Sequence, residues 1–264
     1  MPMEVSSDCK EFNSTFFDTC NKKENSSMLS LNLINLSIAA VMLVYTSYLD
    51  LKKREVEDTV WIAFGIVGGV LQAYEILVGE TAPTQLILSI GLAALIGMGL
   101  YFFGFYGGAD GKALVVLGIL VPVFVPTVHL YDIAPLIVLT NGVLISICLP
   151  VFILIVNLIR LLQKRPIFEG FSEPAYRKLL ACFLGYKQTG KARQFQFIME
   201  KSVSNGNSLT KKFDFSMTHD DFETESGTWV TPGIPLLVFF TIGYFVMLTY
   251  GDLVIGLIQF IVHL

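Results

Sequence analysis

The chain has 264 residues, of which 53% are hydrophobic and only 15% are charged, and its formal net charge is −4. A typical soluble domain carries about 25% charged residues, and a mean hydropathy of +0.64 leaves too little polar surface to cover a globule in water. The composition excludes a disordered chain, a disulfide scaffold built on its four cysteines and a nucleic-acid binder that depends on positive charge. It predicts an all-α polytopic membrane protein.

Six apolar stretches are long enough to cross about 30 Å of hydrocarbon as helices, which takes roughly 20 residues each. They are apolar on every face, whereas the strands of a membrane barrel alternate apolar and polar residues. The six predicted transmembrane helices are 28–49, 59–78, 84–106, 113–130, 134–162 and 233–262. Pro122 and Pro126 predict a kink or an irregular stretch in the fourth. The last two are longer than a span needs, so we expect them to tilt or protrude.

The polar segment 163–229 differs in composition from the rest of the chain. We therefore predict four parts: an extracytoplasmic N-terminal tail (1–27), five transmembrane helices (28–162), a small cytoplasmic domain (163–229) and the sixth transmembrane helix (230–264). Within the domain, residues 173–184 have the spacing of an amphipathic helix. Residues 195–198 and 213–217 alternate in the manner of short strands.

Lys and Arg residues concentrate in alternate loops between the predicted helices. Three of them, at 52–54, follow the first helix, Lys112 follows the third, and eleven more lie between Arg160 and Lys212. The loops 79–83 and 131–133 contain none. The positive-inside rule then predicts a multi-pass protein of the plasma membrane with loops 1, 3 and 5 in the cytoplasm and both termini outside.

Several types of active site are absent from the sequence. It contains no His-Glu-x-x-His zinc motif, no Gly-x-Ser-x-Gly elbow, no phosphate-binding loop and no Cys-x-x-Cys pair. We predict neither a metal nor a cofactor. The candidate chemistry rests on acidic residues at the ends of predicted helices.

Asp50 and Asp110 are the candidate catalytic residues. They lie 60 positions apart with two predicted crossings between them, so both side chains emerge on the same, cytoplasmic face. Two carboxyls within about 3 Å of each other cannot both ionise. The ionised one can take a proton from water while the protonated one donates to a peptide carbonyl, as in aspartic proteases. The alternative is that each aspartate is an ordinary residue at a helix boundary.

The second aspartate lies in a glycine-rich segment, Gly-Gly-Ala-Asp-Gly-Lys, at 107–112. Glycines lack a Cβ atom, so another backbone can approach closely, and an exposed backbone edge can pair with an extended substrate. The predicted substrate-binding residues are Gly107, Gly108, Ala109, Gly111 and Lys112. Alternatively, the glycines form a tight turn, and Lys112 is an interfacial lysine whose charged end reaches the membrane surface.

These motifs resemble those of the archaeal preflagellin peptidases, which are type IV prepilin peptidases distantly related to presenilin and signal peptide peptidase. The segment 48–58 with Trp61 resembles their first catalytic segment, and 107–112 resembles the second, Gly-x-Gly-Asp. Asn141-Gly142 and 229–235 are also similar, and the likeness runs from about Met28 to the C-terminus. The chain departs from the strict pattern at Ala109, and it lacks the four-cysteine zinc segment of the bacterial relatives.

The resemblance implies an intramembrane aspartic endopeptidase in which Asp50 and Asp110 are catalytic. Its substrates would be preflagellins or prepilin-like proteins, whose short basic leader peptides would be cut at the cytoplasmic face, without the methyltransferase activity of bacterial relatives. The implied partners are these substrates and the lipid bilayer, with no nucleic acid. In presenilin-like proteases a proline-containing loop lies beside the site, so residues 231–235 are expected near the dyad; otherwise they simply begin the last helix.

Two interpretations from other classes compete with a peptidase. A small secondary transporter would use intramembrane acids to relay protons or bind its substrate, and it predicts acids near the midplane and an internal repeat. Here the two acids lie at one face, and the two halves of the sequence show no similarity. A membrane adaptor would act through residues 163–229, which leaves the glycine-flanked aspartates without a role.

Overall fold

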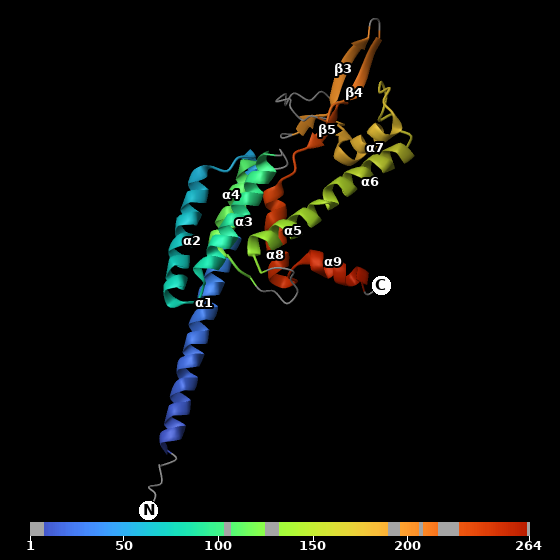
Figure 1. Cartoon of the computed structure of the whole chain (residues 1–264). Coiled ribbons are helices and arrows are strands. Elements are labelled where there is room, and N and C mark those ends of the chain that lie inside the picture. The colour runs from blue at the N-terminus through green and yellow to red at the C-terminus, as the bar shows by residue number, and fades with distance from the viewer. Residues whose placement is uncertain are drawn as a thin grey trace, which may run out of the picture.

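The computed structural model describes residues 8–102, 107–124, 132–189, 196–205, 208–215 and 227–262. Within these ranges the chain is mostly helical with a few short strands, as predicted (Figure 1). The helices are α1 (Asp8–Lys53), α2 (Asp58–Val78), α3 (Pro83–Phe102), α4 (Gly108–Leu120), α5 (Ala134–Ser146), α6 (Cys148–Leu162), α7 (Ala175–Leu184), α8 (Leu236–Thr249) and α9 (Leu253–Val262). The strands are β1 (Tyr186–Lys187), β2 (Gln196–Ile198), β3 (Glu200–Asn205), β4 (Ser208–Phe213) and β5 (Trp229–Pro232).

Three described helical segments are long and apolar enough to cross a membrane. They are Leu31–Lys53, Asp58–Val78 and Ala134–Leu162, and the bent pair α8–α9 is a fourth if it forms one span. On α2, Ile62, Ile66 and Val70 are 61%, 62% and 65% exposed, which suits contact with lipid. The apolar helices indicate a membrane protein, while six spans remain a prediction.

The helical part of the predicted fourth span is short. α4 ends at Leu120, two residues before Pro122, which cannot donate a helical hydrogen bond. The chain then turns irregular, and Phe124 N–H donates to the Asp132 carbonyl at 2.8 Å. The predicted irregularity is confirmed at Pro122, whereas residues 125–130 of the span, including Pro126, lie outside the described residues.

The segment predicted as one helix over 233–262 forms two helices, because α8 and α9 meet at a bend of 62°. Gly251 adopts a positive φ of 89° at the break, a conformation that glycine tolerates without strain. The fully buried Asn141 of α5 holds the break, since its amide nitrogen donates to the Gly251 carbonyl at 2.9 Å and its oxygen accepts from Leu253 N–H at 2.9 Å. A polar side chain inside the bundle thus satisfies backbone groups that the bend leaves unpaired.

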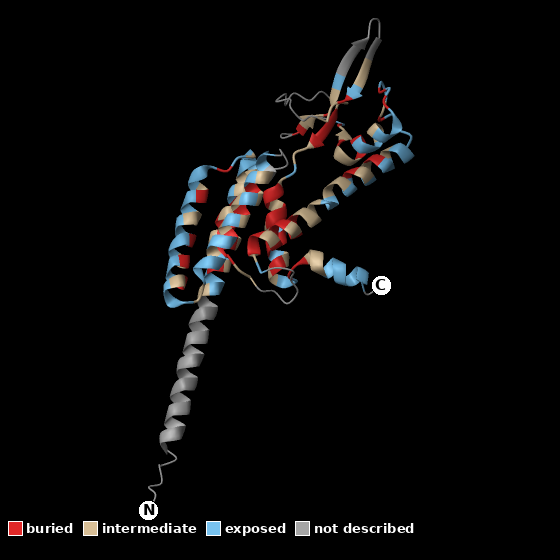
Figure 2. Ribbon diagram, in the orientation of Figure 1, coloured by how far each residue is buried: buried red, intermediate tan, exposed pale blue. Residues whose placement is uncertain are grey.

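Close helix contacts in the bundle depend on small residues. A Cβ atom on Gly243 of α8 would lie 2.7 Å from the backbone nitrogen of Gly142 on α5, so both helices need glycine there. Figure 2 shows buried residues along α4, α5 and α8, whereas α2 is largely exposed and α9 buries no residue. The main apolar core therefore lies among α1, α4, α5 and α8.

The segment between α6 and α8 forms a small unit beside the bundle. Its antiparallel sheet has the order β1–β5–β2, and β3 and β4 form a separate hairpin. A second apolar core surrounds Trp229, whose indole N–H donates to the Ile167 carbonyl at 2.8 Å and whose ring stacks on Phe168 at 5.3 Å.

The expected elements of this unit agree with the structure in part. α7 confirms the amphipathic helix predicted at 173–184, and β2 confirms the strand predicted at 195–198 for its described residues. The strand predicted at 213–217 is wrong, because β4 ends at Phe213 and residues 214–215 are not in a strand; residues 216–217 lie outside the described part. β5 crosses the predicted boundary between residues 229 and 230, and α1 already begins at Asp8, inside the predicted tail.

Replacing Asn141 with Ala is expected to lower the free energy of unfolding by about 1–3 kcal/mol, because backbone groups at the α8–α9 break lose a buried partner. Unfolding in detergent measures the loss. Thr249→Ala is the matched control, because that hydroxyl bonds carbonyls of its own helix. Equal losses in the two variants would contradict this role of Asn141.

Candidate active site

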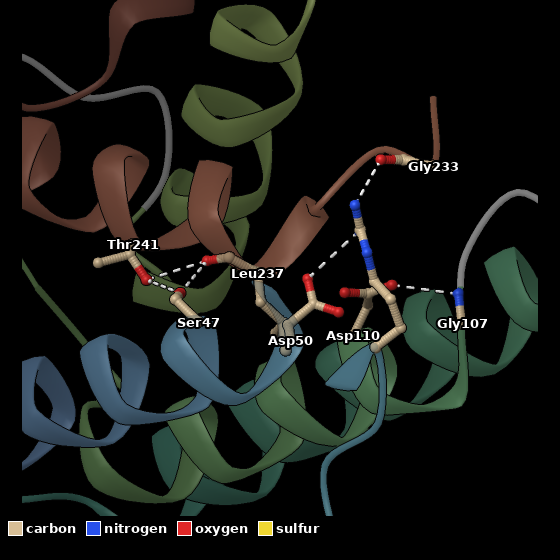
Figure 3. A network of polar contacts seen from close by, with 8 residues as sticks. Ser47, Asp50, Gly107, Asp110, Gly233, Leu237 and Thr241 are labelled. Atoms are coloured by element: carbon tan, nitrogen blue, oxygen red, sulfur yellow. Dashed lines mark hydrogen bonds and ion pairs between the residues drawn. The ribbon is translucent and has the colours of Figure 1, made fainter. Parts of the chain in front are cut away.

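Asp50 lies in the last turn of α1, where that helix contacts the beginning of α8. One turn earlier, the Ser47 hydroxyl lies 2.8 Å from the Leu237 carbonyl and 2.6 Å from the Thr241 hydroxyl (Figure 3). These contacts fix the end of α1 against α8. The Asp50 side chain is 15% exposed, so it lies near the protein surface without being freely solvated.

Asp110 lies in the first turn of α4. Its Oδ2 atom accepts from Gly107 N–H at 3.1 Å, which satisfies a backbone donor that the helix start leaves free. The next residue, Gly111, packs against α3, where a Cβ atom on Gly97 would lie 2.9 Å from the Gly111 Cα. The position of Asp110 therefore depends on a close approach of α3 and α4.

The structure brings the two acids together from α1 and α4, and Figure 3 shows their carboxyl groups side by side. Asp110 precedes the predicted transmembrane segment 113–130 and therefore lies outside it. Burial raises the pKa of Asp110, and the nearby charge of Asp50 raises it further, to about 7. The hydrogen bond from Gly107 N–H and the positive charge of Arg54 act in the opposite direction. Asp110 is therefore suited to hold and exchange a proton near neutral pH.

Arg54 links the acids to the segment before α8. It ends α1 with a positive φ of 56°, and its guanidinium lies 3.9 Å from Asp50 Oδ2. The same guanidinium donates to the Gly233 carbonyl at 2.7 Å. The expectation that residues 231–235 lie near the dyad is thus confirmed. The sequence pattern places Arg54 only among the cations at 52–54 that set the orientation, and the contact to Gly233 was not predicted, although the i,i+4 spacing of Arg54 from Asp50 places both on one helix face.

A cavity of about 420 Å³ opens beside Asp110. Gly107 and residues 231–234 line one part of it, and apolar side chains such as Leu149 and Ile153 of α6 line another. Phe197 of β2 also contributes, so the walls come from both the helical bundle and the sheet unit. The arrangement provides a largely apolar cleft whose lining includes the Asp110 carboxyl.

The predicted substrate-binding residues occupy two sides of α4. Gly107 shares the cavity with Asp110, whereas Ala109 packs against the main apolar core. The other three, Gly108, Gly111 and Lys112, line a separate groove of about 650 Å³ with residues of α2 and α3. There the Lys112 ammonium pairs with Asp58 at 2.5 Å, so its described partner is an exposed acid of α2.

Comparisons with known proteins indicate a peptidase. The model of the type IV leader peptidase family matches residues 37–162, which contain both aspartates. A preflagellin peptidase of Methanocaldococcus jannaschii is 29% identical over 244 residues, which cover 85% of this chain and 97% of that protein. This chain is similar to that preflagellin peptidase over most of its length.

Two further relatives carry the same name. The preflagellin peptidase of Methanococcus voltae is 29% identical over 86% of this chain and 99% of its own length. That of Methanococcus maripaludis is 27% identical over 83% of this chain and 96% of its own length. The resemblance inferred from the motifs is confirmed, and the comparisons support a peptidase.

Arg54→Met is expected to raise the pKa of Asp110, because the variant removes a positive charge that stabilises the ionised carboxyl. Arg54→Lys keeps the charge and is expected to shift this pKa less. Infrared titration of the protonated carboxyl band measures the pKa, and Asp110→Asn identifies the band.

Lys53→Met serves as the control, since Lys53 is a neighbouring exposed cation. An Asp110 carboxyl that titrates at the same pH in Arg54→Met and in the wild type would show that Arg54 does not act on the dyad.

Proposed function

We propose that the chain is an aspartic endopeptidase that cleaves preflagellins, the substrates named for its relatives, or related prepilin-like proteins. The observation that carries the proposal is the meeting of Asp50 and Asp110 beside a cavity that can hold a polypeptide. A raised pKa of about 7 on Asp110 supports a pair that shares one proton at neutral pH.

The two acids take different roles in the proposed reaction. Asp50, next to the Arg54 guanidinium, is the ionised member and accepts a proton from the attacking water. Asp110, which is more easily kept protonated, donates its proton to the oxygen of the scissile carbonyl. The water oxygen then bonds to the carbonyl carbon. When the tetrahedral intermediate collapses, the carbon–nitrogen bond breaks, Asp50 passes its proton to the leaving amine, and a hydroxyl of the intermediate returns a proton to Asp110.

The segment before α8 supports binding of an extended substrate. Pro232, the last residue of the central strand β5, lines the cavity together with Gly233 and Ile234, which follow it. The Arg54 contact to the Gly233 carbonyl fixes this segment beside the carboxyls. A protease needs an extended substrate because a helix hides the scissile carbonyl, and backbone along such a segment can pair with one.

The charge distribution favours cleavage at the cytoplasmic face. Lys52 and Lys53 lie with Asp50 in the last turn of α1, and the sheet unit that completes the cavity follows Arg160 of α6. In this arrangement residues 163–229 form the cytoplasmic domain, and both termini lie outside a multi-pass plasma-membrane protein.

A transporter is less well supported at Glu75, a buried acid away from the dyad, because its carboxylate already has several partners. Glu75 accepts from Asn35 at 2.6 Å, from Gln72 at 3.0 Å and from Thr81 at 2.9 Å. It lines a separate cavity from Asp110. Such a set of bonds fixes α1 against α2 and suits a structural role.

Asp50→Asn and Asp110→Asn are each expected to reduce preflagellin cleavage at least about 100-fold, because asparagine keeps the shape but cannot exchange the proton. The measurement is the rate of appearance of shortened preflagellin with purified protein. Expression and thermal stability of both variants should match the wild type.

Asp58→Asn is the matched control, because Asp58 pairs with Lys112 on the other side of α4. Its rate should stay within a few-fold of the wild type. Near wild-type cleavage by either Asp50→Asn or Asp110→Asn would refute the proposed function.

A further inference from the structure

A second cavity of about 370 Å³ lies between α6 and the sheet unit. It adjoins the Asp110 cavity, because Leu149, Ile153 and Pro232 line both. A polypeptide that passes the carboxyls can therefore continue along the same walls. The lining of this second cavity includes two glutamine side chains, those of Gln188 and Gln196.

Gln188 is only 3% exposed, yet neither atom of its side-chain amide has a hydrogen-bond partner among the described residues. Its backbone is fully paired, since its N–H donates to the Thr228 carbonyl and its carbonyl accepts from Gly227 N–H, each at 2.9 Å. The main chain of Gln188 is thus fixed by hydrogen bonds, while its side-chain amide has no partner among the described residues. Unpaired buried amide atoms destabilise a folded protein, and a ligand that forms hydrogen bonds with them would offset that cost.

Gln196 repeats this feature on the neighbouring strand. It is 4% exposed, and its amide nitrogen donates to the Tyr186 hydroxyl at 2.5 Å. Within the described part of the chain its amide oxygen has no donor. Together these two lining residues hold one N–H donor group and two oxygen acceptors that are buried and have no partner in the described part of the chain.

The chemistry of the lining favours a neutral ligand. The charged side chain on this cavity, Arg160, already donates to the Lys187 carbonyl at 2.6 Å and lies 5.9 Å from the centre of the Tyr186 ring. Among its described lining residues there is no acid. A peptide group carries one N–H donor and one carbonyl acceptor, which is the pairing that an open glutamine amide can complete.

We infer that this cavity is a substrate subsite, in which the amides of Gln188 and Gln196 bind the main chain of the substrate polypeptide away from the bond that is cut. The inference rests on the proposed peptidase function and adds a set of contacts outside the catalytic pair. These contacts hold the substrate equally before and during the reaction, so they affect binding more than the chemical step.

The test is steady-state cleavage of full-length preflagellin by Gln188→Met, together with thermal unfolding of the same protein. Methionine keeps the length of the side chain and removes the amide. We expect KM to rise about threefold to tenfold, as for one lost hydrogen bond, with kcat nearly unchanged. The unfolding temperature should not fall, because the amide has no partner to lose. Gln196→Met should raise KM in the same direction.

Gln163→Met, at the exposed end of α6, is the control and should leave KM and kcat at wild-type values. A wild-type KM in Gln188→Met would overturn the subsite, and so would a fall in its unfolding temperature with a matching loss of kcat. A wild-type protein that does not cleave preflagellin would instead overturn the proposed function and, with it, the subsite. Failure of the subsite is therefore seen in the Gln188→Met variant, whereas failure of the proposed function is seen in the wild-type protein.

Discussion

Repulsion between two half-buried carboxyls is the constraint on which this site depends. Asp50 and Asp110 come from helices that are distant in sequence, and bringing two negative charges together in a poorly solvated place is unfavourable. The structure offsets this cost in two ways. Arg54 places a positive charge near both acids, and Asp110 retains a proton up to a pH of about 7. The same balance makes the pair useful as a proton donor and acceptor.

The contacts of Arg54 also determine how the backbone is arranged around the two acids. Arg54 reaches both Asp50 and the Gly233 carbonyl from a left-handed position at the end of α1. The segment before α8 must therefore approach α1, and Ser47 adds a second link between the same helices one turn away. The two acids come from the bundle, whereas the walls of the cavity come partly from the sheet unit.

Sequence reasoning predicted those features that depend on one-dimensional patterns. Hydrophobic length gave the helices, and counting crossings placed Asp50 and Asp110 at the same end of the bundle. It could not assign sides of α4, because successive helical residues point about 100° apart. Gly111 therefore packs on α3 and Lys112 pairs with Asp58, although both are sequence neighbours of Asp110.

Features set by long-range contacts were missed for a different reason. The α8–α9 break is held by Asn141, more than a hundred residues away, and its only local sign is Gly251-Asp252, where Asp252 Oδ1 accepts from Val254 N–H. The strand β5 is short and ends in proline, so only its pairing with β1 and β2 defines it. Arg54 and Gly233 are likewise 179 residues apart. The local sequence pattern does not show which residues so far apart in the chain contact each other.

The most direct test of the account is a double-mutant cycle on the two acids. Preflagellin cleavage rates are measured for Asp50→Asn, Asp110→Asn and the double variant. If the two carboxyls act as one unit on a shared proton and water, the double variant loses no more activity than the more damaged single variant. If the two losses multiply, the acids act independently, and the account of a shared dyad is contradicted.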